Sequence, residues 1–218
     1  FFAQNQTTVD LLHSIDIKNV MLSGDTRFDR VIENKNGLTE NPIIRSFVGE
    51  SKNVFIAGST WPQDEELLQE LIQSNRFEKY IIAPHNVDKQ HIVSLMARLN
   101  SPVVRYSESN EQQLQPSPIL VIYKIGKLAS AYSYASIAYV GGGFSGSLHN
   151  ILEPAVFGIP VIFGPKFSRF PEAQVFIDNG IGFSVADEQE LNRTVQQLIA
   201  DRDQIAEKSI HFVEKNRG

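Results

Sequence analysis

Short apolar segments alternate with segments of helical periodicity along most of the chain, and this alternation limits the fold more than any other feature. Residues 64–72, for example, have an acidic first turn and apolar residues in i, i+1, i+4, i+5 spacing, as in an amphipathic helix. Such alternation indicates βαβ units and an α/β, Rossmann-like, doubly wound parallel sheet. We expect strands at residues 53–57, 80–83, 102–106, 119–123, 137–140, 160–163 and 182–185, and helices at 64–72, 88–99, 128–135, 148–157, 171–178 and 188–199.

The first 45 residues do not follow this alternation. Residues 9–15 have a helical pattern and residues 20–22 the composition of a strand, whereas residues 25–41 are polar and rich in turn-forming residues. The chain opens without Met or a signal-peptide pattern, as expected for a piece of a longer protein. We interpret residues 1–45 as the tail of a preceding domain with its linker, 46–200 as the sheet domain, and 201–218 as a C-terminal helix.

Composition excludes several classes of site. The 218 residues include no Cys, which excludes disulfides, thiol nucleophiles and thiolate metal sites. No His and acid share metal-ligand spacing, so we expect neither a metal nor a cofactor. The formal net charge of −5 argues against a nucleic-acid surface. The longest apolar segment, residues 155–164, is interrupted by Pro160 and falls well short of the roughly 20 residues that cross a bilayer.

Three loops follow predicted strands and are therefore candidates for ligand binding. Ligands of open parallel sheets bind beyond the carboxyl ends of the strands, where loops lead into helix N-termini. That rule selects residues 58–61, 84–87 and 141–150.

The third loop contains Gly141, Gly142 and Gly143 within a G-x-G-x-x-G pattern. A dinucleotide site also needs an acid at the end of the next strand, but that strand ends with Phe163 and Gly164, which disfavours an NAD-dependent oxidoreductase. Three adjacent glycines exceed the needs of a tight turn, so we expect backbone that approaches a ligand closely.

Polar residues in the same loops can contact that ligand. Asn150 and Glu153 share a helix face, where the carboxylate can accept ribose hydroxyls, although helix capping explains both residues as well. Ser59 and Thr60 can hold a phosphate or simply cap a helix. His85 can donate to a phosphate, but a lone loop His is more often a solvated residue.

Several segments together resemble the 3-deoxy-D-manno-octulosonic acid (Kdo) transferase family over essentially the whole chain. The segments that carry the resemblance are 24–30 (GDTRFDR), 57–60 (AGST), 138–143 (AYVGGG), 149–155 (HNILEPA) and 158–165 (GIPVIFGP). The family implies a two-domain GT-B glycosyltransferase, of which this chain would be the C-terminal, nucleotide-binding half. The helix at residues 201–218 would pack back on the missing N-terminal half.

The resemblance also implies an activity and its site residues. It implies transfer of Kdo from CMP-Kdo to lipid IV-A in lipopolysaccharide biosynthesis, on the cytoplasmic face of the Gram-negative inner membrane. The catalytic base and the membrane-facing acceptor surface would lie in the missing half, so the fragment alone would be soluble and inactive. The implied donor-binding residues are Ser59, Thr60, His85, Ile125, Gly126, Gly142, Gly143, Asn150 and Glu153.

Two departures from the family pattern concern donor contacts. His85 stands where many members have Arg, and Tyr123 or Lys124 stands where many have Asp. Two alternatives stay open: a GT-B enzyme with another donor, such as a UDP-sugar, and a non-catalytic nucleotide-binding module.

Overall fold

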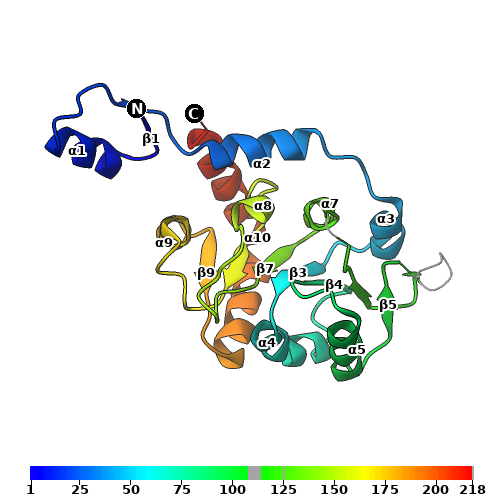
Figure 1. Ribbon diagram of the computed structural model, residues 1–218. Coiled ribbons are helices and arrows are strands. Elements are labelled where there is room, and N and C mark those ends of the chain that lie inside the picture. The colour runs from blue at the N-terminus through cyan, green and yellow to red at the C-terminus, as the bar shows by residue number, and fades with distance from the viewer. Residues whose placement is uncertain (108–113, 125, 218) are drawn as a thin grey trace.

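The computed structural model describes residues 1–107, 114–124 and 126–217, which form a large and a small unit, each around a parallel sheet (Figure 1). The large sheet has the order β5-β6-β4-β3-β7-β8-β9. Its strands are β3 (Val54–Thr60), β4 (Lys79–Pro84), β5 (Val103–Arg105), β6 (Ile119–Val121), β7 (Ile137–Val140), β8 (Val161–Phe163) and β9 (Gly182–Ser184). The helices of this unit are α2 (Thr26–Asn36), α3 (Pro42–Val48), α4 (Pro62–Gln73), α5 (Lys89–Arg98), α7 (Leu128–Tyr132), α8 (Leu152–Ala155), α9 (Pro171–Asp178) and α10 (Glu188–Lys215).

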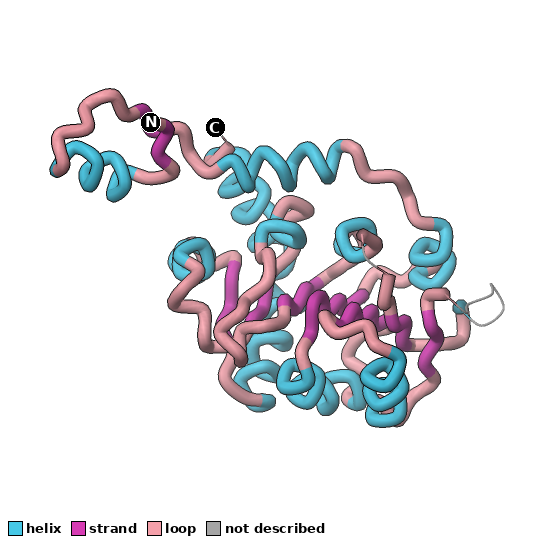
Figure 2. Tube along the Cα trace, in the orientation of Figure 1, coloured by secondary structure: helices cyan, strands magenta, loops and turns pink. Residues whose placement is uncertain are grey.

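Helices cover both faces of the large sheet. Figure 2 shows the strands as a central layer, with α4 and α5 below it and α3 and α7 above it. Successive strand residues point to opposite faces. In β3, Phe55 and Ala57 therefore join the larger apolar cluster, and Val54 and Ile56 join the smaller one. Burial on both faces explains why the strands are continuous apolar runs.

Most predicted elements are present with shifted ends, and residues 137–140 and 171–178 form a strand and a helix as predicted. Within residues 25–48, however, the structure contains two helices that the sequence pattern did not predict. Asp25 caps α2 by accepting a hydrogen bond from the Arg27 backbone, and the helix buries Phe28 and Val31 in the core while the partly buried Ile32 packs against it. Because so few apolar residues mark the buried face of this polar segment, its helical periodicity is not visible in the sequence.

Two other helices differ in length from the prediction. Residues 148–157 contain only the short α8, because residues 144–150 form turns and irregular backbone before it. In contrast, α10 continues without interruption through the expected break near residue 200. Its second half buries Ile205 and Val213 in the larger cluster of the same unit, and its Ser209 hydroxyl donates to the Ala155 carbonyl at 3.0 Å.

The small unit consists of β1 (Phe2–Ala3), α1 (Gln6–Ser14) and β2 (Met21–Leu22), with β1 and β2 paired in parallel. Its apolar side chains are unusually open: Phe2 is 80% and Met21 62% exposed. Figure 1 shows this unit beside α2, away from the large sheet. Across the described ranges, no helix combines the length and apolar character needed to cross a membrane.

Candidate functional site

Loops that follow three neighbouring strands meet at the carboxyl edge of the large sheet. The ring of Trp61, after β3, stacks on the ring of His85, after β4, with centroids 4.4 Å apart. The His85 ring lies 4.7 Å from that of His149, after β7, and Trp61 Nε1 donates to His149 Nε2 at 3.3 Å. The three loops selected from the sequence are therefore in contact, as the parallel-sheet rule predicts.

A fully buried carboxylate, Asp64, ties two of these loops together. It accepts hydrogen bonds from the Trp61 backbone at 2.8 Å, the Gly142 backbone at 3.0 Å and the Tyr139 hydroxyl at 2.6 Å. From the sequence, Asp64 was predicted only as part of an acidic first turn. An acid at the third position of a helix is the signal of a capping box, but its two partners on and after β7 leave no local signal.

The glycine loop packs closely on its neighbours, so part of the backbone that was predicted to face a ligand at Gly142 and Gly143 is already engaged within the protein. The Gly142 N–H already donates to Asp64. A Cβ on Gly143 would lie 2.7 Å from the Gly164 Cα, and one on Gly141 would lie 2.7 Å from the Thr60 Cα. All three glycines are buried, so the backbone that they bring close is that of adjacent loops.

Ser59 and Thr60 present their side chains in opposite ways. Ser59 adopts φ 54°, a left-handed conformation uncommon outside glycine, and its half-buried hydroxyl has no hydrogen-bond partner among the described residues. Thr60 is fully buried and donates its hydroxyl to Glu65 at 3.3 Å. The Ser59 hydroxyl is therefore open to the predicted contact with a phosphate, whereas the Thr60 hydroxyl is already engaged with Glu65.

Gly58 brings a fourth loop to the same edge. A Cβ on Gly58 would collide with the Tyr132 hydroxyl and would lie 2.8 Å from Leu128 Cδ2. Both residues belong to α7, so this short helix lies directly against β3. The preceding loop contains Gly126, which is exposed and has φ 79°, and a Cβ at this position would meet no atom within 4 Å.

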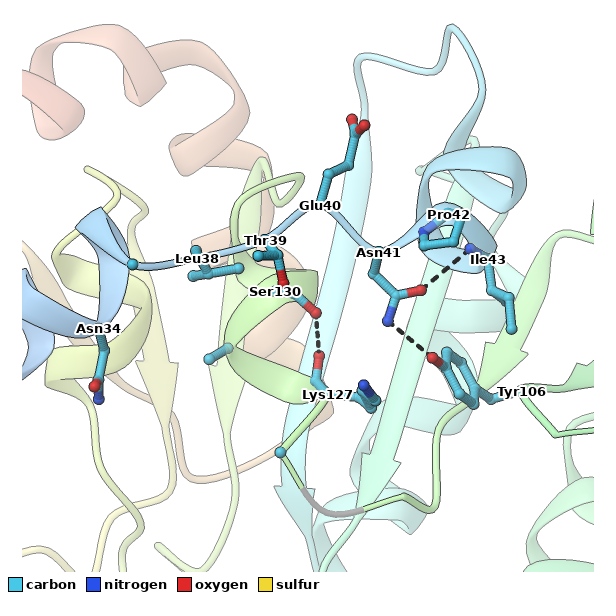
Figure 3. Close-up of a pocket in the computed structure, with 13 residues that line it drawn as sticks. Asn34, Leu38, Thr39, Glu40, Asn41, Pro42, Ile43, Tyr106, Lys127 and Ser130 are labelled. Carbon is cyan, nitrogen blue, oxygen red and sulfur yellow. Dashed lines mark hydrogen bonds between the residues drawn. The ribbon is translucent and has the colours of Figure 1, made fainter.

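The Gly126 loop borders a hollow of about 390 Å³ between α7 and residues 37–43 (Figure 3). Asn41 donates to the Tyr106 hydroxyl at 2.8 Å, and its side-chain oxygen accepts from the Ile43 backbone, which fixes one wall. Asn34 of α2 also lines this hollow. The other residue predicted for this loop, Ile125, lies outside the described residues.

Asn150 and Glu153 line a second hollow, of about 480 Å³, together with Asn34, Arg30 and His149. Since Asn34 borders both hollows, the two adjoin. Asn150 accepts from the Leu152 backbone and donates to Glu153 at 3.2 Å, but the N-cap of α8 is Ile151, so the predicted capping box does not form. Burial raises the pKa of Glu153, and the Asn150 bond offsets part of that effect.

These hollows offer both signs of charge to a polar ligand. Glu153 supplies an acceptor, whereas the exposed Arg30 makes no ion pair with any described residue. Arg27 is already engaged, with Asp25 and Glu172 each 2.7 Å away. Within the described ranges, no three His or acidic side chains are grouped as metal ligands.

Comparison with known proteins finds relatives along almost the whole chain. The 3-deoxy-D-manno-octulosonic acid transferase of Rickettsia typhi is 22% identical over 227 residues, covering 98% of this chain and 48% of the relative. The enzyme of the same name from Aquifex aeolicus is 29% identical over 168 residues, covering 74% of this chain and 45% of the relative. The chain thus spans about half the length of these relatives. No family model matches it.

A solved structure shares the fold. The C-terminal CMP-Kdo binding domain of WaaA from Acinetobacter baumannii superimposes with a TM-score of 0.67 at 22% identity, covering 85% of this chain and 98% of that one. The predicted α/β, Rossmann-like fold, as in the C-terminal domain of a GT-B glycosyltransferase, is confirmed. The predicted resemblance to the Kdo transferases is confirmed by the sequence matches, and the structural match is to a C-terminal domain.

Proposed function

We propose that this chain, related in sequence to the C-terminal half of the Kdo transferases, is the donor-binding half of a glycosyltransferase that moves Kdo from CMP-Kdo to lipid IV-A. The observation that supports this proposal is that Ser59 lies at the carboxyl end of one strand of the large parallel sheet and that the Gly126 loop and Glu153 follow the carboxyl ends of two others, in a chain that matches a relative over 98% of its length. The second domain would be supplied by the remaining half of the protein.

Each contact has a defined part in holding cytidine monophosphate. The free hydroxyl of Ser59 donates to the phosphate, and the Glu153 carboxylate accepts from the ribose hydroxyls. The cytosine ring occupies the adjoining hollow beside Gly126, where a Cβ would meet no atom within 4 Å. His85 contributes through its ring, which is stacked on that of Trp61.

The proposed reaction is an inverting glycosyl transfer. An acceptor hydroxyl attacks the anomeric carbon of Kdo, the bond from that carbon to the phosphate oxygen breaks, and CMP leaves with the bonding electrons. The base that takes the hydroxyl proton lies in the other half of the protein. We therefore expect this chain alone to bind CMP and to transfer no sugar.

The proposed domain organisation follows the packing. The exposed side chains of Phe2 and Met21 indicate that β1 and β2 continue a sheet of the preceding domain, because parallel strands are normally covered on both faces. The burial of Phe28 favours a boundary near residues 23–25 rather than 45. The acceptor is a lipid, so peripheral association with the cytoplasmic face of the inner membrane would come through the other half.

Calorimetric titration of the chain with CMP, UDP and GDP tests the donor. We expect CMP to bind at least tenfold more tightly than either competitor, and Glu153→Gln to weaken CMP binding about tenfold, as for a lost hydrogen bond to a charged group. The matched control is Glu66→Gln, since Glu66 is an exposed acid that lines neither hollow. A preference for UDP would favour a UDP-sugar donor.

An assay of the two-domain protein with CMP-Kdo and lipid IV-A tests the reaction. Transfer by that protein and none by this chain is the expected result. A two-domain protein that binds CMP yet transfers nothing would favour the non-catalytic module.

A further inference from the structure

Two aromatic side chains at the sheet edge have no part in the contacts proposed above. Trp61 Nε1 lies 3.3 Å from His149 Nε2, and both rings are half-buried. An indole N–H can only donate, so the His149 Nε2 must present its lone pair. A neutral imidazole with an unprotonated Nε2 carries its proton on Nδ1. Trp61 therefore selects one tautomer of His149.

Trp61 is itself held firmly enough to enforce that choice. Its backbone N–H donates to the buried Asp64, which also holds the Gly142 backbone of the loop that leads to His149. Its ring stacks on His85 with an interplanar angle of 19°. In addition, the His149 backbone N–H donates to the Gly141 carbonyl at 3.1 Å. Donor and acceptor thus sit on two loops joined by one carboxylate.

The other ring nitrogen of His149, Nδ1, is available to bind a ligand. Nδ1 makes no hydrogen bond to any described residue, although His149 lines the hollow of about 480 Å³ that also contains Arg30 and Glu153. We propose that the Nδ1–H of neutral His149 donates a hydrogen bond to an anionic oxygen of the bound nucleotide, and that Trp61 is the positioning residue that fixes this tautomer. The donor role of His149 rests on the proposed function, whereas the tautomer does not.

The charged groups around His149 are consistent with a neutral ring. Burial and the neighbouring His85, on the β4–α5 loop, lower the pKa of His149, and Asp64 of α4 opposes them. Arg30 of α2, Glu153 of α8 and Glu172 of α9 line the same hollow. Protonation would also place an N–H on Nε2, facing the Trp61 N–H.

Nitrogen-15 NMR of the ligand-free chain tests the tautomer. We expect His149 to be neutral at pH 7 with its proton on Nδ1. Trp61→Phe keeps a ring to stack on His85 but removes the indole N–H, so we expect a mixture of tautomers and a higher pKa of His149, because a bond that favours the neutral form is lost. A wild-type His149 that is protonated on Nε2 would overturn the proposal.

Titration with CMP tests the donor role. We expect His149→Ala to weaken CMP binding about tenfold to a hundredfold, Trp61→Phe to weaken it less, and His149→Asn, whose amide can place an N–H near the position of Nδ1, to recover part of the loss. A His149→Ala variant that binds CMP as the wild type does would overturn the donor role. Wild-type chain that shows the expected tautomer but does not bind CMP would instead overturn the proposed function, and the donor role with it. Thermal unfolding identifies any variant that is misfolded, and Trp61→Phe then carries the test.

Discussion

Gly141 and Gly126 lie in two loops at the same edge of the sheet, and the two positions need glycine for different reasons. A Cβ on Gly141 would press into the backbone of Ser59 and Thr60, whereas one on Gly126 would meet nothing within 4 Å. Gly126 instead has φ 79°, so its need for glycine is conformational. A glycine in a loop at this edge is therefore not by itself evidence that the backbone approaches a ligand. The segment that lies close to Gly141 is another loop of the same chain.

The largest effect is expected from the pair Gly141→Ala and Gly126→Ala. Gly141→Ala forces apart two buried backbone segments, and we expect it to lower the free energy of unfolding by about 3 kcal/mol or more. Gly126→Ala places an L residue at positive φ with free space around it, which costs about 1 kcal/mol. Urea unfolding of both variants measures the difference. Equal losses would mean that conformation, not packing, explains both glycines.

The next largest effect is expected from Asp64→Asn. The amide oxygen can keep the hydrogen bonds from the Trp61 and Gly142 backbones, but the NH₂ group then faces the Tyr139 hydroxyl, which would have to accept instead of donate. We expect a loss of about 2 kcal/mol in the free energy of unfolding. Asp201→Asn, at an exposed position of α10, is the control and should change stability by less than about 0.5 kcal/mol. A loss in Asp64→Asn no larger than in the control would show that the β3 and β7 loops hold together without this carboxylate.

Much of the fold could be predicted because each buried strand and amphipathic helix carries its own period. Residues 137–140 and 171–178 were predicted with their observed ends. The exceptions have physical reasons. The helix α2 was missed because only Phe28 and Val31 of this polar segment are fully buried, and α8 was predicted too long because Asn150 ends an irregular loop two residues before it.

The site could be predicted only to the level of its loops. The ends of the predicted strands identified the three loops. The sequence also identified Glu153, an acid that lines a hollow in the structure. The direction of a side chain was not predictable: Ser59 and Thr60 are adjacent, yet one hydroxyl is free and the other is bonded to Glu65. The partners of Asp64 and of Trp61 lie roughly 80 residues away along the chain, where no local pattern records them.

A smaller effect is expected at Gly58, where the obstruction is a side chain rather than backbone. A Cβ there collides with the Tyr132 hydroxyl, which a fully buried ring can move only slightly. We expect Gly58→Ala to cost about 1–2 kcal/mol in stability. Tyr132→Phe removes the colliding oxygen. We therefore expect the double variant to lose less stability than the sum of the losses of the two single variants. Strict additivity in urea unfolding would show that α7 does not rest on Gly58 through this hydroxyl.

The smallest effect is expected at Glu153, which borders open space as the Gly126 loop does. Burial raises its pKa, so the folded chain binds this proton more tightly than the unfolded chain does. Stability then falls as the pH rises from the ordinary value of 4.5 through the raised pKa, and the cost is complete above it. Glu153→Gln, which cannot ionise, should therefore be slightly more stable than the wild type at neutral pH and equal to it below the ordinary value. Urea unfolding at both pH values checks this. A less stable variant at neutral pH would mean that the carboxylate stabilises the fold, whereas a stabilised variant with weakened CMP binding would mark Glu153 as a residue kept for its ligand.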